Sequence, residues 1–250
     1  PVVQQKSVDH EPRLIVKVYS LEQLQEANAA GVYAIYYDVF SPDVEMAKNI
    51  CTQAKFFLDT PVVVTDQDIE KIQQLVTTVK PDGIPLGNWG LLSIKFAGEK
   101  HGKFSLNVFN DVSVDALSKR GVLPTISAEL NAKQALNMKN KEFIYYAHGQ
   151  IPVMHFKGAY PQKALTDELK YTFPLRTVNG NTEMLYSRPI ALFEKVHELI
   201  DGGVKWFLLD LSKDTTTIIK AYQNVIQGVE QDISMLKKGT TIGNYAKGVA

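Results

Sequence analysis

Apolar runs rich in β-branched and aromatic residues alternate with amphipathic runs along most of the chain. The apolar runs predict eight strands, at residues 14–20, 33–39, 61–66, 82–87, 104–109, 123–128, 143–148 and 205–211. The runs between them have helical spacing, as in Ile69, Ile72 and Val76, which share one face of a helix that ends at Pro81. Strict alternation of strands and helices predicts a parallel sheet with right-handed crossovers.

Two of the predicted helices are long segments between strands. One covers residues 41–59, with Ser41 as its cap and Pro42 at its first position. Another covers residues 89–102, between the fourth and fifth predicted strands.

Eight strand–helix units in a chain of 250 residues are typical of a TIM-like (β/α)8 barrel of the α/β class. An open doubly wound sheet is the alternative, and its dinucleotide-binding form needs a glycine-rich turn after the first strand. The corresponding turn, residues 19–23, reads YSLEQ and has no glycine. The sequence therefore favours a closed barrel of parallel strands.

One long interval, from His148 to Pro189, lacks the strand–helix rhythm. Such intervals in a regular domain are usually functional or disordered. This interval contains Phe, Tyr, Leu and Met throughout, so we expect it to be ordered. We predict a long irregular insertion between the seventh and eighth strands, which has to cross the C-terminal ends of the strands, the mouth of the barrel.

The overall charge of the chain is balanced, with 27 Lys and Arg against 27 Asp and Glu. No basic excess is available to follow a phosphate backbone over the whole surface, although a local basic patch remains possible. No run approaches the roughly 18 apolar residues of a membrane span, and no leader-like segment opens the chain. We therefore expect a cytoplasmic protein without membrane contact, in which residues 1–13 form a polar linker and residues 14–250 a single domain.

The chain has a single cysteine, Cys51, so a disulfide framework and a four-cysteine metal site are excluded. Cys51 stands at helical spacing from Ala47, Ala54 and Leu58. This spacing is typical of a small buried residue, so we do not expect Cys51 to act as a nucleophile.

Polar residues at the C-terminal ends of barrel strands form the active face of such barrels. Nine polar residues stand at or near these ends: Asp38, Asp66, Asn88, Asn107, Asn110, Glu129, His148, Gln150 and Asp210. We predict a pocket at the mouth, roofed by residues 150–189, and six residues that line or approach it. These binding residues are Asn88, Asn107, His148, His155, Arg188 and Asp210.

Several of these residues have a second interpretation. Asn107 stands between apolar neighbours, so its amide either ties barrel strands together or contacts a ligand. His148 and His155 could form a metal pair, but no third ligand has a recognisable spacing, so we predict no metal. Arg188, at the start of a helix, could hold an anion or form a surface salt bridge.

The common catalytic motifs are missing: there is no GxSxG elbow, no GxxxxGK[ST] loop and no HExxH helix. No spacing shows that any two carboxylates face each other, so the catalytic residues stay unknown. Composition and spacing by themselves indicate a barrel domain with a polar mouth.

Seven short phrases in one order carry a family resemblance. They are GNWG (87–90), SLNVFN (105–110), SAEL (127–130), HGQIPVM (148–154), FPLR (173–176), LYSRPI (185–190) and GNYAKGV (243–249). Together they resemble the collagenase-like peptidase family U32, over about residues 14–250. The likeness is greatest to the C-terminal barrel of its long multidomain members.

The resemblance implies a barrel fold and a protease label. Other members of the family act in the hydroxylation of RNA bases or of quinones and hold an iron–sulfur cluster through cysteines. This chain has Tyr160-Pro161 where relatives have Cys-Pro, lacks the other cluster cysteines in 156–182, and has Gln150 where the family has Arg. A typical cluster needs four thiolates, so the resemblance implies a domain without the cluster, and we expect no cofactor.

Two classes of function therefore stay open. The first is a U32 peptidase, a hydrolase with an unidentified site at the barrel mouth. The second is a non-catalytic accessory barrel of an RNA-modification enzyme, which binds RNA, a peptide or another domain of a longer chain.

Overall fold

Eight parallel strands form the centre of the protein, whose residues 11–248 are described by a computed structural model. They are β1 (Arg13–Lys17), β2 (Ala34–Asp38), β3 (Lys55–Asp59), β4 (Gly83–Leu86), β5 (Glu99–Gly102), β6 (Val122–Pro124), β7 (Ile144–Gly149) and β13 (Trp206–Asp210). Each run is short, most of them are apolar, and neighbouring runs pair in parallel register, so the α/β architecture is the predicted one.

The sheet curls so that its two ends meet. β1 pairs with β13 along its whole length, as predicted for the first and last strands of a barrel. At the other join, Thr125 and Ile144 form a parallel bridge, and Ile126 N donates to Ile144 O at 3.1 Å. The strands therefore form a TIM-like barrel, in which β6 and β7 touch only near the N-terminal end of β7 and diverge toward the mouth.

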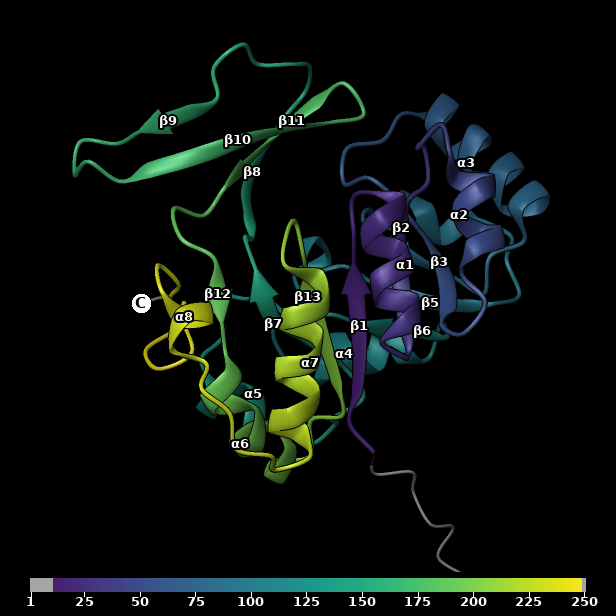
Figure 1. Cartoon of the computed structure of the whole chain (residues 1–250). Helices are drawn as coiled ribbons and strands as arrows, with labels where there is room; N and C mark the ends of the chain where they lie inside the picture. Colours follow the sequence, from purple (N-terminus) through teal and green to yellow (C-terminus); the bar gives the residue numbers. More distant parts are fainter. Residues whose placement is uncertain (1–10, 249–250) are drawn as a thin grey trace, which may run out of the picture.

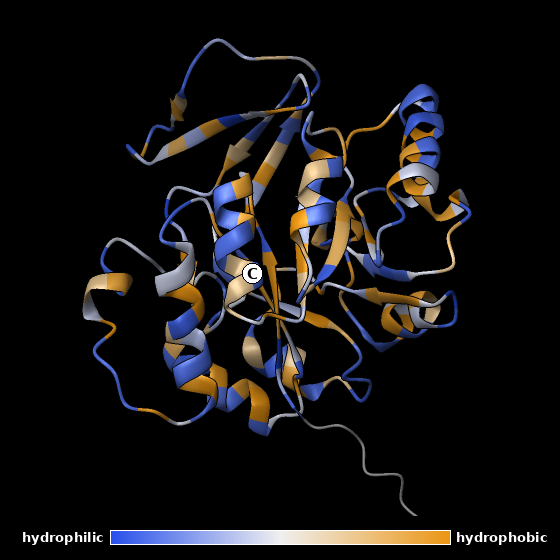
Figure 2. Ribbon diagram, turned by 45° about the vertical axis from the view of Figure 1, so that its right-hand side comes forward, coloured by the Kyte–Doolittle hydropathy of each residue, from blue (hydrophilic) through white to orange (hydrophobic). Residues whose placement is uncertain are grey.

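Helices cover the outside of this barrel (Figures 1 and 2). The α-helices are α1 (Leu21–Ala29), α2 (Val44–Ile50), α3 (Asp66–Val79), α4 (Asp111–Ser118), α5 (Ala132–Asn137), α6 (Val196–Asp201), α7 (Thr215–Ile226) and α8 (Ser234–Lys237). Three short 3-10 helices are η1 (Trp89–Ser93), η2 (Phe104–Leu106) and η3 (Phe193–Lys195). Figure 2 shows that the helices are mixed in hydropathy while the central strands are mostly apolar, which is the pattern of a helix-covered barrel.

Aromatic side chains fill the lower part of the barrel interior. Tyr36, Phe57 and His101 come from three different strands and pack with ring centroids 4.6–5.8 Å apart. The Tyr36 hydroxyl and His101 Nδ1 are hydrogen-bonded at 2.5 Å. The barrel therefore has a packed floor below its mouth.

The predicted strand 61–66 is wrong, because the third strand is β3, inside the predicted helix 41–59. α2 ends at Ile50, where the Asn28 side chain takes over the free backbone groups: its amide donates to Ile50 O, and its oxygen accepts from Gln53 N and Ala54 N. The sequence around Ile50 has no local signal for this helix end, because the residue that stabilises it, Asn28, belongs to α1. The run after Asp59 instead leads to α3, whose start is a capping box of Thr65 and Asp68.

The fifth strand also lies earlier than predicted, at β5 instead of 104–109, so the predicted helix 89–102 is wrong. Only the five residues of η1 are helical in that segment. Gly98 explains the change: a Cβ there would lie 2.6 Å from Asp82 O, so glycine allows the chain to turn closely past β4 and extend beside it.

The segment predicted as an irregular insertion is an ordered antiparallel sheet, which stands above the mouth in Figure 1. Its strands β8 (Pro152–Phe156), β9 (Ala164–Thr166), β10 (Thr172–Val178) and β11 (Asn181–Leu185) follow the order β8-β11-β10-β9. Asn179 and Gly180 join β10 to β11 with positive φ values of 52° and 74°, the conformation for which the Asn-Gly pair is suited. We call residues 152–185 the insert sheet. Strand β12 (Ile190–Ala191) then pairs antiparallel with the upper part of β7.

The expected linker, residues 1–13, lies largely outside the described residues, and Arg13 already belongs to β1. Within the described part of the chain, every helix is too short or too polar to cross a membrane.

Candidate functional site

Charged side chains gather where the parallel strands end. The register sets Lys17 beside Asp210, and Asp38 beside Asp59, at the C-terminal ends of β1, β13, β2 and β3. Lys103, which follows β5 directly, joins them. These residues come from five strands, and only the closing of the barrel brings them to one place.

Asp59 is the centre of this cluster. Its two carboxylate oxygens contact Lys17 Nζ at 2.9 Å and Lys103 Nζ at 2.8 Å, and all three side chains are at most 14% exposed. Burial acts to raise the pKa of Asp59, but the charges of Lys103 and Lys17 outweigh it and hold that pKa below its usual value. Burial acts to lower the pKa of Lys17, but Asp59, Tyr19 and Asp210 hold it well above its usual value. Lys17 is therefore an ammonium at neutral pH and unsuited to Schiff-base chemistry.

A second group lies beside it, around Asp210. The Tyr19 hydroxyl donates to Asp210 Oδ1 at 2.6 Å. The guanidinium of Arg176, from β10 of the insert sheet, lies 4.5 Å from the centre of the Tyr19 ring. This contact is one of the points at which the insert sheet rests on the barrel.

The underside of the insert sheet supplies three more ionisable groups. Arg176, Glu183 and His155 are direct neighbours across β10, β11 and β8. Arg176 donates to Glu183 Oε2 from Nε at 3.0 Å and from Nη2 at 2.7 Å, and His155 Nδ1 lies 3.8 Å from Glu183 Oε1. Burial lowers the pKa of His155 more strongly than Glu183 raises it, so the imidazole is neutral at pH 7.

The tip of the insert sheet is also tied to the barrel. Asn179 Nδ2 donates to both carboxylate oxygens of Asp38, at 3.1 and 3.0 Å. The insert sheet is thus a lid that contacts the mouth through Asn179 and Arg176 and places His155 at the edge of its cavities.

Three cavities under and beside this lid are bordered by His155. Two are small, about 20 and 30 Å³, and are bordered by Lys17, Asp59, Lys103 and Glu183. The third, about 580 Å³, is within the usual size of a ligand pocket. We call this cavity the mouth groove. The described residues that line it are Val62, Phe104, Ser105, Asn107, Ser127, Ala128, Glu129, Ile151, Pro152, Val153, His155, Tyr186, Ile190, Gly243 and Asn244. His155 borders all three cavities, so it stands where the mouth groove meets the charged cluster.

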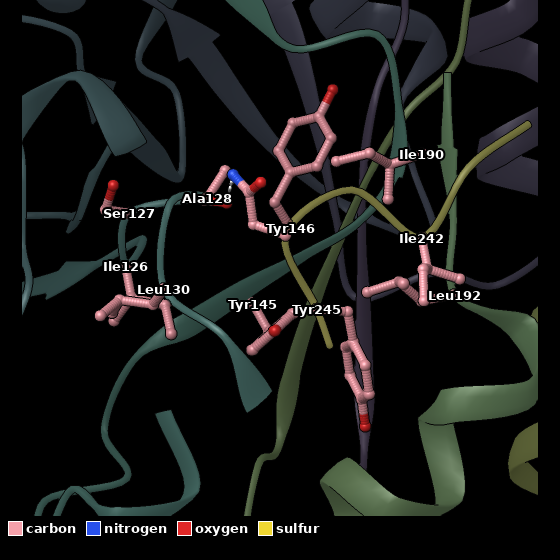
Figure 3. Close-up of a pocket in the computed structure, with 11 residues that line it drawn as sticks. Ile126, Ser127, Ala128, Leu130, Tyr145, Tyr146, Ile190, Leu192, Ile242 and Tyr245 are labelled. Carbon is pink, nitrogen blue, oxygen red and sulfur yellow. Dashed lines mark hydrogen bonds between the residues drawn. The ribbon is translucent and has the colours of Figure 1, made fainter. Parts of the chain in front are cut away.

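The wall between β6 and β7 exists because these strands diverge. Figure 3 shows a small neighbouring pocket of about 20 Å³ at this opening, in which Ser127 and Ala128 after β6 lie opposite Ile190 and Ile242, with the Tyr146 ring between them. Ser127, Ala128, Ile190 and Asn244 border both this pocket and the mouth groove. Asn244 Nδ2 donates to Ala128 O at 3.1 Å, which fastens the C-terminal segment across this gap. The groove is therefore built from remote segments that fill an opening in the barrel.

Three of the predicted site residues lie at the mouth. His155 and Asn107 line the mouth groove, and Asp210 borders a small cavity. Asn107 is not buried in a strand, as one interpretation had it; it is exposed after η2 with a φ of 53°. Their role in binding stays a prediction.

The other three predicted residues are placed elsewhere. Asn88 caps η1: its Oδ1 accepts from Gly90 N at 2.8 Å and its Nδ2 donates to Val62 O at 3.1 Å. Arg188 is exposed between β11 and β12 and does not line the groove. His148 is buried and points outward from the barrel, where its Nδ1 lies 3.3 Å from the Tyr222 hydroxyl.

The outward position of His148 has a clear cause. Leu208 pairs with Tyr146, but Leu209 pairs with His148, so β7 has one extra residue, a bulge, at this point. Regular alternation would put Tyr146 and His148 on the same face. The bulge instead leaves Tyr146 at the mouth cavity and packs His148 against Phe193 and Tyr222.

This packing predicts a pH effect on stability. Burial lowers the pKa of His148 to about 4, below the ordinary 6.5. The unfolded chain binds the proton more tightly, so the stabilising contribution is complete above pH 6.5 and is lost as the pH falls toward 4, by roughly 2–3 kcal/mol. In urea titrations, His148→Phe is expected to lose that much less stability than the parent chain between pH 7 and 4. Equal losses in both proteins would contradict the burial of a neutral imidazole here.

Sequence reasoning missed Lys17, Lys103, Arg176 and Glu183 as site residues. Lys17 had a signal, because it is the one charge within the apolar run LIVKV. Arg176 and Glu183 had another: the Asn-Gly turn between two alternating runs predicts a hairpin and sets them opposite each other.

The described residues offer no paired nucleophile and base at the mouth. Cys51 is buried at the end of α2, and burial raises the pKa of its thiol to about 11. The Ser105 hydroxyl donates to Gly87 O, and the Ser127 hydroxyl accepts from Glu129 N. Across residues 11–248, His, Cys, Asp and Glu form no group of three or more that could hold a metal ion.

No protein-family model and no curated protein matches the sequence. Solved structures do match. Thiamine phosphate pyrophosphorylase from Pyrococcus furiosus has a TM-score of 0.50 at 12% identity, over 89% of this chain and 99% of its own. Orotidine 5'-monophosphate decarboxylase from Methanocaldococcus jannaschii has a TM-score of 0.50 at 13% identity, over 87% and 99%. The aldolase QR15 has a TM-score of 0.50 at 8% identity, over 89% and 100%. At these identities the likeness shows the TIM-barrel-like fold alone.

Proposed function

We propose that this chain is a U32-like barrel domain that binds an extended peptide in the mouth groove, as a binding domain and not as a peptidase on its own. The size and lining of the groove carry this proposal. Apolar and aromatic groups such as Ile151, Val153 and Tyr186 stand in it beside the amides of Asn107 and Asn244. Such a mixture suits a polymer with alternating side chains and amide groups.

The charges of the groove favour a peptide over RNA. None of the described residues that line it is Lys or Arg. The lysines of the mouth, Lys17 and Lys103, are instead bound to Asp59. Contacts between cationic side chains and phosphate groups supply most of the affinity of RNA-binding surfaces. The groove therefore lacks the cationic side chains that RNA binding requires.

The chemistry of the site favours binding over cleavage. Hydrolysis of a peptide needs an activated nucleophile or a metal-bound water. The candidate hydroxyls, Ser105 and Ser127, are held by partners other than His155. An iron–sulfur cluster of the U32 type does not fit this chain either, because Cys51 is its single cysteine and ends the outer helix α2.

A peptide-binding assay tests this proposal. A library of fluorescein-labelled hexapeptides is screened by fluorescence polarisation, with labelled single-stranded RNA 12-mers as the comparison. Tyr186 is 37% exposed at the groove, and Tyr171 is 51% exposed on the insert sheet outside it. Tyr186→Ala is expected to weaken peptide binding roughly tenfold, a typical loss for an aromatic contact, and the matched control Tyr171→Ala to leave it unchanged.

Three results would overturn the proposal. The first is that no peptide binds, and the second is that RNA binds more tightly and is lost in Tyr186→Ala. The third is that mass spectrometry finds the bound peptides cleaved by the parent chain.

A further inference from the structure

Glu129 is the one carboxylate among residues 11–248 on the wall of the mouth groove. Of the described residues that line the groove, Glu129 is the one with a carboxylate side chain and His155 the one with an imidazole. Because burial lowers the pKa of His155, its imidazole is neutral at pH 7. The groove therefore has one uncompensated negative charge.

Within the described part of the chain, the carboxylate of Glu129 differs from Asp59 and Glu183 in having no ion-pair partner. Asp59 is shared by two lysines, and Glu183 is bound by Arg176. Glu129 is exposed, and no cation of the described residues forms an ion pair with it. Its charge is thus available to a molecule that enters the groove.

The backbone that presents Glu129 is held in place. Ser127 N donates to Val108 O at 2.9 Å, and Ala128 O accepts from Asn244 Nδ2 at 3.1 Å, the bond that Figure 3 draws. Glu129 N donates to the Ser127 hydroxyl at 3.3 Å, and the next residue, Leu130, is buried. These contacts on both sides mean that little ordering of the loop is needed when a ligand binds.

We infer that the mouth groove selects peptides with a basic side chain, Lys or Arg, which Glu129 binds. The inference deepens the proposed peptide-binding function and rests on it. A charge-assisted hydrogen bond to a carboxylate at the wall of a partly apolar groove discriminates against neutral and acidic residues by both attraction and repulsion.

A charge-swap experiment tests this inference. Hexapeptides that differ only in one central residue, Lys, Gln or Glu, are titrated into the parent chain and into Glu129→Gln and Glu129→Lys. The parent is expected to bind the Lys peptide roughly five- to tenfold more tightly than the Gln peptide, and Glu129→Gln to lose this preference. Glu129→Lys is expected to prefer the Glu peptide. Glu70→Gln, which removes an exposed carboxylate on the outer helix α3, is the matched control and is expected to behave as the parent.

The possible results distinguish failure of this inference from failure of the proposed peptide binding. If peptides bind but the three central residues give equal affinities, or if Glu129→Gln keeps the Lys preference, the inference is wrong and peptide binding stands. If no hexapeptide binds to any of the proteins, both are wrong. A Lys preference that Glu70→Gln also removes would assign it to the overall charge and would overturn the role of Glu129.

Discussion

Replacing Asp59 with Ala is expected to lower the free energy of unfolding by roughly 3–5 kcal/mol, because it leaves two buried ammonium groups without their carboxylate. Lys17 and Lys103 contact opposite oxygens of Asp59 from strands that the barrel brings together, and neither side chain is more than 14% exposed. Urea titration at pH 7 measures the loss.

Two further variants check the cause. Combining Asp59→Leu with Lys17→Met and Lys103→Met removes the charges together and is expected to recover most of the stability. Glu142→Ala breaks a pair whose carboxylate side chain is 54% exposed and is expected to cost at most about 1 kcal/mol. A triple variant as unstable as Asp59→Ala would mean that the shape of Asp59, and not its charge, is what the site needs.

The same carboxylate makes the protein sensitive to acid. Burial raises the pKa of Asp59, but the neighbouring lysines outweigh it and hold the pKa below the ordinary 3.8. The folded state therefore binds the proton less readily than the unfolded chain does. The contribution of Asp59 is complete above pH 3.8 and is lost as the pH falls through the lowered pKa.

Gly149→Ala is expected to cost roughly 2–5 kcal/mol, through overlap and backbone strain together. Gly149 has a φ of +119°, which side chains of L-residues rarely adopt. An added Cβ would lie 2.3 Å from Asp210 O and 2.8 Å from the Tyr146 hydroxyl. The variant would push β7 away from β13 at the mouth, so loss of peptide binding is expected with the loss of stability.

Gly158→Ala separates the two causes. Gly158 also has a positive φ, +93°, but nothing lies within 4 Å of its added Cβ. This variant is expected to lose only the strain, about 1–2 kcal/mol. Equal losses of unfolding free energy for the two variants, measured by thermal and urea unfolding, would show that the close approach to Asp210 contributes nothing to the cost of Gly149→Ala.

The periodicity of apolar residues by itself determined the fold class and the positions of the strands that are clearly bounded by polar residues. The runs around β1, β2, β7 and β13 are short, apolar and bounded by polar residues, so local pattern located them and predicted their parallel pairing. It also located Asp210, because a polar residue after a buried run marks a strand end.

Other elements depended on contacts that no local pattern records. The end of α2 depends on Asn28, which lies far back in the chain, and the position of β5 depends on how closely Gly98 passes Asp82. A strand-like run in such places is as compatible with a loop as with a strand, and tertiary packing decides between them.

The candidate site was decided almost entirely by the tertiary structure. A bulge of one residue in β7 turned His148 outward and left Tyr146 at the mouth. The divergence of β6 from β7 opened the mouth groove, and segments as distant as residues 104–107 and 243–244 became its walls. Periodicity reports which face of its own element a side chain occupies, whereas a site depends on which remote elements meet, and closure of the barrel alone sets that.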